Sequence, residues 1–191
     1  MPHHIANVAI RRAPRVVDWV GMPTPFSFEH VFRADAPATI LAAYFDPGHL
    51  AMQDAVGELE GRTVTETRDD GKTLRTTWRV ISQRQLPAIA RPFVGKGGKL
   101  VYFETMTWRR ADDAVDLTVI PDILSGRVKI AATYELKKVG EGQVSRRYAG
   151  TVTANIVMVS SRIERGIVEA FDESMAKMAA VTQRWLDASA R

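Results

Sequence analysis

A histidine interrupts a row of aromatic residues in the segment "FSFEHVFR". Phe26, Phe28 and Phe32 alternate there with other residues, and His30 stands between Phe28 and Phe32 in the same row. Residues two apart in a β-strand point to the same side of a sheet, so the whole row is predicted to face inward. A buried imidazole without a hydrogen-bonding partner costs about 1–3 kcal/mol. His30 is therefore either hydrogen-bonded within the core or part of a binding or catalytic site.

Two later strand-like segments add further polar groups to the inward rows. The alternation in "VYFETMTW" predicts that Glu104 points inward, and that in "QVSRRYAGTVTAN" predicts the same of Arg146 and Tyr148. A buried carboxylate has to be paired, so Glu104 is expected to bind Arg146 or His30. These four side chains could polarise a ketone and take a proton next to it. The alternative is a structural network of hydrogen bonds.

Other chemistries find no support in the sequence. His3, His4 and His49 lie at no spacing that would build a metal site with His30. The chain has no cysteine, so it has no thiolate nucleophile and no disulfide framework, as suits a protein of the reducing cytoplasm. The stretch "GKGGK" at residues 95–99 lacks the Ser or Thr and the spacing of a phosphate-binding loop. We therefore expect no metal and no cofactor.

The elements that hold these side chains follow from the hydrophobic pattern. After the first strand the period becomes helical, with Asp35 as the expected N-cap, and two short helices are predicted on either side of a break at residues 46–48. Strand-like segments then follow one another for about a hundred residues, which indicates an antiparallel meander. The chain closes with a long helix, for which Ser161 and Glu164 predict a capping box.

Aromatic residues on the inward rows are interpreted as core or as the lining of a cavity. A platform for nucleic-acid bases would instead expose them among basic residues. The basic residues that belong to the strands fall on outward rows, where they form a solvated face or favour an acidic partner; they are Arg75, Arg79, Arg109, Arg127, Lys129 and Arg147.

Length and composition predict one domain. The 191 residues are 46% hydrophobic and 25% charged, and Pro23 and Pro25 place the start of the domain near residue 25, after an N-terminal extension of residues 1–24. The net charge is only +4, and the 26 basic residues are scattered along the chain, so no nucleic-acid binding is expected. A targeting segment and a stretch of about 18 apolar residues for a membrane span are both missing, and a cytoplasmic protein is predicted.

An apolar segment interrupted by prolines and glycines separates two of the strands. In "LPAIARPFVGKGGK" the residues from Leu86 to Val94 cannot form an ordinary strand, so a loop or short helix at the sheet edge is predicted. Such a segment acts as a lid over a cavity, as a tip that touches a membrane, or as a dimer contact. The alternative is a plug that packs over the core.

The order of these elements resembles the START-like helix-grip superfamily, also called SRPBCC or polyketide cyclase-like. Within it the sequence most resembles the DUF2505 family, through "FEHVFRADAPATILAAYFDPGHL", "ETMTWRR" and "RIERGIVEAF". The resemblance implies an α+β helix-grip fold, in which a curved antiparallel sheet of about seven strands wraps around the C-terminal helix. It also implies a deep cavity for lipids, hormones, polyketides or other apolar ligands, but no particular reaction.

The favoured interpretation is a non-catalytic binding protein for an apolar small molecule or lipid, occupying residues 25–191. Its predicted lining is His30, Trp78, Tyr102, Glu104, Trp108, Tyr134, Tyr148, Phe171 and Met175. One alternative is a cyclase- or aromatase-like enzyme that acts on a polyketide-type substrate through His30, Glu104, Arg146 and Tyr148. Another is an interaction protein whose cavity is filled by its own side chains. The sequence indicates no oligomeric state.

Overall fold

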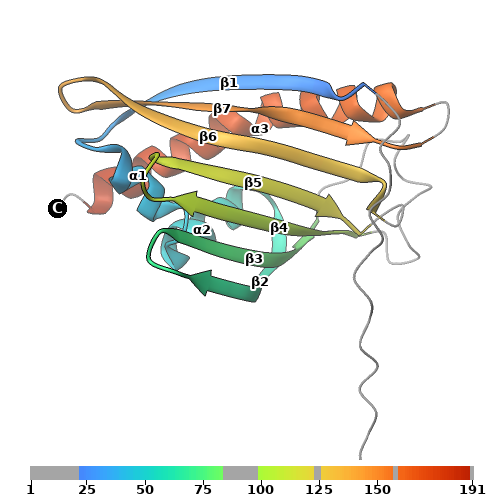
Figure 1. The fold of residues 1–191 in the computed structure, drawn as a ribbon, viewed down its shortest axis with the longest axis horizontal. Helices are drawn as coiled ribbons and strands as arrows, with labels where there is room; N and C mark the ends of the chain where they lie inside the picture. Colours follow the sequence, from blue (N-terminus) through green and yellow to red (C-terminus); the bar gives the residue numbers. More distant parts are fainter. Residues whose placement is uncertain (1–21, 84–98, 123–125, 157–158, 190–191) are drawn as a thin grey trace, which may run out of the picture.

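A computed structural model describes residues 22–83, 99–122, 126–156 and 159–189 of the chain (Figure 1). The strands are β1 (Thr24–Arg33), β2 (Leu59–Asp69), β3 (Thr73–Ser82), β4 (Leu100–Arg109), β5 (Ala114–Pro121), β6 (Val128–Gly140) and β7 (Gln143–Ala154). The helices are α1 (Pro37–Ala43), α2 (Pro47–Val56) and α3 (Ser160–Ser189). Residues 1–21 of the predicted extension 1–24 and the segment Leu86 to Val94 lie outside the described residues, and β1 begins at Thr24.

The strands form one curved antiparallel sheet in the order β1-β7-β6-β5-β4-β3-β2 (Figure 1). Strands β2 to β7 are neighbours in sequence order, and β1 pairs with β7, so the first and last strands of the chain lie side by side. Gly71 and Gly142, in the turns after β2 and β6, have φ values of 81° and 61°, which glycine adopts without strain. The α+β helix-grip architecture predicted from the sequence is confirmed.

The inward rows predicted from the period of two are also confirmed. In β1, Phe26 and Phe32 are buried, whereas Ser27 and Val31 are exposed. In β3, Thr76, Trp78 and Val80 are buried and alternate with more exposed residues. We call the face that these rows share the inner face of the sheet and the opposite one the outer face.

The two short helices follow β1 as expected, with one difference at the first cap. The N-cap of α1 is Ala36, not Asp35, and it makes no side-chain capping hydrogen bond; Pro37 opens the helix in its place. Asp46 caps α2, and its Oδ1 accepts hydrogen bonds from the backbone N–H groups of Gly48 and His49 at 2.8 and 3.0 Å. The predicted break between the helices is therefore an N-cap followed by a proline.

The long helix α3 packs against β1, β7, α1 and α2. Its apolar stripe runs through Ile163, Phe171 and Trp185, as the helical period predicts. The predicted capping box is wrong, because Glu164 turns toward the sheet: its carboxylate accepts hydrogen bonds from the backbone N–H of Ala154 and the hydroxyl of Thr24, both at 2.7 Å. Glu164 is buried, and it ties the start of α3 to the ends of β1 and β7.

Candidate functional site

Arg146 lies on the inner face, on the strand next to the β1 edge of the sheet, and is 1% exposed. It belongs to the inward row of β7, where His30 of β1 and Leu136 of β6 stand opposite it in the register. Its Nη1 donates a hydrogen bond to the hydroxyl oxygen of Tyr44 at 2.6 Å, and its Nη2 donates one to Nδ1 of His30 at 3.2 Å. Its Nε is buried and has no hydrogen-bonding partner among the described residues.

Aromatic rings complete the surroundings of this guanidinium. The Arg146 carbon Cζ lies 5.0 Å from the ring centre of Phe32, 5.4 Å from that of Tyr134 and 6.0 Å from that of Tyr44. The negative face of an aromatic ring attracts a cation, and more strongly when water is excluded. No carboxylate among the described residues forms an ion pair with Arg146. The positive charge of Arg146 is therefore stabilised by the faces of three aromatic rings and by two neutral hydrogen-bond acceptors, the Tyr44 oxygen and Nδ1 of His30.

Glu104 points inward as predicted, but its predicted partner is wrong. Its Oε1 accepts a hydrogen bond from Nη1 of Arg62 at 2.7 Å, and Nε of the same arginine binds Asp54 at 2.9 Å. Arg62 comes from β2, whose register against β3 shifts at two places and whose sequence shows no apolar alternation. No pattern in the sequence marks Arg62 as inward, so the sequence predicts Arg146 or His30 as the partner of Glu104 where the structure has Arg62.

His30 is neutral in this arrangement: it accepts a hydrogen bond from Arg146 through Nδ1 and carries its proton on Nε2. A guanidinium only donates hydrogen bonds, so Nδ1 of His30 is the acceptor and its proton resides on Nε2. Burial, and secondly the charge of Arg146, lowers the pKa of His30. Among the described residues, no group accepts a hydrogen bond from Nε2. His30 is therefore hydrogen-bonded within the core, which is one of the two alternatives that its place in the aromatic row predicts. Its Nε2–H group remains available for a further hydrogen bond.

Tyrosine and phenylalanine rings extend from Arg146 along the inner face. The ring centres of Tyr134 and Tyr148 lie 4.4 Å apart, and those of Tyr44 and Tyr134 lie 5.1 Å apart. Phe171 of α3 packs on Tyr148 with a centroid distance of 6.4 Å. Burial raises the pKa of both Tyr134 and Tyr148, so their hydroxyls keep their protons and are available as donors.

The predicted lining residues of β3 and β4 form a second group around Arg62. Trp78 is buried under Phe45, and the guanidinium of Arg62 lies 5.6 Å from the centre of its ring. Trp108 stacks on the same Phe45 ring with a centroid distance of 6.0 Å. All nine predicted lining residues therefore lie on the inner face or on the side of α3 that packs on it; they are His30, Trp78, Tyr102, Glu104, Trp108, Tyr134, Tyr148, Phe171 and Met175. The fold brings His30 and Tyr148 to Arg146 and places Glu104 with Arg62.

His49 is a buried polar residue that sequence reasoning set aside. It is fully buried at the start of α2, where its Nε2 lies 3.0 Å from the hydroxyl of Thr182 on α3. The Thr182 hydroxyl donates to the carbonyl of Met178, so it accepts the Nε2 proton of His49. The rings of Tyr44 and Trp185 flank the imidazole. Burial lowers the pKa of His49 to about 4.

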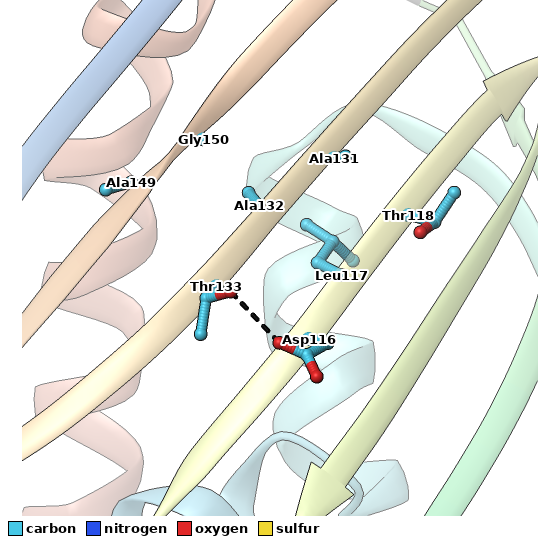
Figure 2. A pocket seen from close by; sticks show the side chains of 8 residues that line it. All are labelled: Asp116, Leu117, Thr118, Ala131, Ala132, Thr133, Ala149 and Gly150. Atoms are coloured by element: carbon cyan, nitrogen blue, oxygen red, sulfur yellow. Dashed lines mark hydrogen bonds between the residues drawn. The ribbon is translucent and has the colours of Figure 1, made fainter.

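A shallow hollow of about 340 Å³ lies over β5, β6 and β7 (Figure 2). It is lined mainly by small residues of the outward rows, among them Ala131, Thr133 and Ala149. Thr133 donates a hydrogen bond to Asp116 at 3.0 Å, and Asp116 also pairs with Arg109. This hollow belongs to the outer face, so it is separate from the group around Arg146.

A family model described as "Protein of unknown function (DUF2505)" matches residues 27–186. The chain belongs to the DUF2505 family. The matched region runs from β1 almost to the end of α3, so it includes every residue of the Arg146 and Arg62 groups. A search of curated proteins returned no match.

Solved structures show that this DUF2505 chain has a START-like fold. The Zhui aromatase/cyclase from Streptomyces sp. R1128 is 7% identical, with a TM-score of 0.62 over 89% of this chain and 97% of that one. A START superfamily protein from Mycobacterium smegmatis is 14% identical, with a TM-score of 0.59 over 85% and 98%. Norcoclaurine synthase from Thalictrum flavum is 15% identical, with a TM-score of 0.57 over 86% and 87%. At these identities the likeness concerns the fold alone.

In the part of the chain that the structure describes, none of the helices has the length and hydrophobicity needed to span a bilayer. The same residues contain no cluster of His, Asp and Glu that could hold a metal ion.

Proposed function

We propose that this protein binds an apolar small molecule or lipid between the inner face of its sheet and α3, without catalysing a reaction. The observation that carries the proposal is the state of the inward aromatic residues. Tyr102, Trp108, Tyr134 and Phe171 pack on the core cluster but remain only partly buried. A filled protein interior is packed to the density of a crystal, which leaves little accessible surface on large inward side chains.

Apolar surroundings with a few polar groups are typical of a small-molecule site. On the inner face these polar groups are His30 and Arg146 at one position and Arg62 with Glu104 at another. Such groups orient a ligand, whereas the aromatic rings supply most of the buried area. The accessible surface that remains on the inward aromatic rings argues against the alternative of an interaction protein whose cavity is filled by its own side chains.

The geometry around His30 favours binding over general-base catalysis. A general base needs a free lone pair close to the proton that it removes. The Nδ1 lone pair of His30 faces Arg146, and Nε2 carries the remaining proton. Glu104, the other candidate base, is held by Arg62 at 2.7 Å. The similar structures include an aromatase/cyclase and a norcoclaurine synthase, so the cyclase alternative is compatible with the fold. The likeness says nothing about the residues of the site.

Fluorescence of the neutral probe N-phenyl-1-naphthylamine tests the proposal, supported by native mass spectrometry of protein purified from its own host. The substitution Met175→Asp places a charge on the partly buried lining side of α3. Ala176→Asp adds the same charge at the next, exposed position of the helix and serves as the control. We expect saturable probe binding by the unchanged protein and a loss of about tenfold or more in affinity for Met175→Asp only.

Absence of saturable binding, or equal effects of the two substitutions, would contradict the proposed function. A co-purified apolar molecule in the native mass spectrum would identify the physiological ligand directly.

A further inference from the structure

We propose that the molecule bound on the inner face carries an oxyanion, such as a carboxylate, which binds the donor cluster formed by Arg146, His30, Tyr44, Tyr134 and Tyr148. This inference rests on the proposed function and specifies the chemistry of its ligand. It is drawn from the imbalance between hydrogen-bond donors and acceptors in the cluster.

The two acceptors that Arg146 contacts are already used within the donor cluster. The Tyr44 oxygen accepts from Nη1 of Arg146 at 2.6 Å, and Nδ1 of His30 accepts from Nη2 at 3.2 Å. Each of these two residues consequently directs its own proton elsewhere, Tyr44 through its hydroxyl and His30 through Nε2.

The remaining polar groups of the cluster are also donors without a described acceptor. Nε of Arg146 is buried and unpartnered. Among the described residues, no group is hydrogen-bonded to the hydroxyl of Tyr134 or Tyr148, and burial keeps both hydroxyls protonated. A group that complements this cluster has to accept several hydrogen bonds, which is the property of an oxyanion.

Charge points to the same chemistry. Arg62, the other arginine of the inner face, is bound by two carboxylates, those of Asp54 and Glu104 at 2.9 and 2.7 Å. Arg146 is more deeply buried and is bound by none among the described residues. Burial of an unpaired charge is costly, and an anion that reaches it recovers part of this cost. An acidic ligand is therefore drawn toward Arg146 and repelled from the carboxylates around Arg62.

The donor cluster is open on one side. Arg146, Tyr44 and Tyr148 are buried, but His30 and Tyr134 are partly exposed, as are the neighbouring rings of Phe28 and Phe171. A ligand whose apolar body lies against these rings can place an oxygen near Nε2 of His30 and the Tyr134 hydroxyl. Arg146 then supplies the positive charge next to both residues, since its Nη2 lies 3.2 Å from Nδ1 of His30 and its Cζ lies 5.4 Å from the ring centre of Tyr134.

Competition between matched acids and esters tests this inference. Bound N-phenyl-1-naphthylamine is displaced at pH 7.5 by 2-naphthoic acid or its methyl ester, and by dodecanoic acid or its methyl ester. We expect at least one acid to bind about tenfold more tightly than its own ester. The better of the two pairs shows whether the apolar body is aromatic or aliphatic.

Two substitutions on the same strand locate the effect. Arg146→Met removes the buried cation and should bring acid and ester to within about twofold of each other. Arg147→Gln removes an equal charge from the exposed, outward-facing neighbour and should leave the preference intact. If Arg146→Met does not fold by circular dichroism, Tyr134→Phe decides, since it keeps the ring and removes only a hydroxyl that donates to the ligand oxygen, and it should lower the preference for the acid.

The outcomes separate this inference from the proposed function. If the neutral probe does not bind at all, the proposed function fails. If the probe binds but acids and esters compete equally, the binding function stands and the oxyanion is refuted. A preference for acids that is not lowered in the deciding variant, or that Arg147→Gln also abolishes, places the anion elsewhere and overturns the inference as well.

Discussion

The buried imidazole of His49 should make the folded protein sensitive to mild acid. In the folded chain, burial lowers the pKa of His49 to about 4 from the ordinary value of 6.5. The unfolded chain therefore takes up a proton as the pH falls below 6.5, whereas the folded chain does so only near pH 4. The free energy of unfolding should be constant above 6.5, fall between 6.5 and 4, and change no further below that range on account of this residue.

The size of the effect follows from the two pKa values. The difference between 6.5 and about 4 corresponds to about 3 kcal/mol when the titration is complete. At pH 5 the unfolded imidazole is almost fully protonated and the folded one almost neutral, so the protein should have lost about 2 kcal/mol relative to pH 7.5. For a domain of this size this loss lowers the melting temperature by about 4–8 °C.

The variant His49→Gln isolates this contribution. The side-chain amide of glutamine can occupy the place of Nε2 and donate to the hydroxyl of Thr182, but it does not titrate. Urea unfolding at pH 7.5 and pH 5.0 should show that the unchanged protein loses about 2 kcal/mol more than the variant. His30→Gln, measured in parallel, accounts for the other described histidine whose pKa is lowered. Equal losses in the unchanged protein and His49→Gln would refute the reasoning.

Three further substitutions have expected outcomes. Gly150→Ala should destabilise the protein by about 1–3 kcal/mol in urea unfolding, because the added Cβ would lie 2.2 Å from the carbonyl oxygen of Ala131; a neutral result would mean that β6 and β7 separate easily there. Glu164→Ala should cost about 2 kcal/mol by leaving the Ala154 N–H unpaired, and Glu164→Gln clearly less; equal losses would exclude this hydrogen bond as the cause. His30→Gln should change probe affinity by less than about tenfold; a loss of a hundredfold or more in turnover of a polyketide-type substrate would instead identify a general base.

The sequence determined the rows of the sheet and the class of the fold. The aromatic row of β1, the inward placement of Arg146 and Tyr148, and the stripe of α3 all follow from periods of 2 and 3.6, which the backbone imposes on each element by itself. Proline and aspartate at residues 46–47 fixed the break between α1 and α2 for the same local reason. His30, Glu104, Arg146 and Tyr148 could thus be named before their neighbours were known, whereas Tyr44 and Arg62 could not.

Only the tertiary structure decided which of these residues meet. Arg146 binds Tyr44 because α1, which ends just before Tyr44, packs against α3 and β6, and the two residues are 102 positions apart in the sequence. Glu104 binds Arg62 because a strand without apolar alternation, with shifts in its register, turns an arginine inward. His49 is buried because α2 packs against α3. Period and propensity act within one segment of chain, whereas the pairing of charges depends on the register and packing of several segments, which no single one encodes.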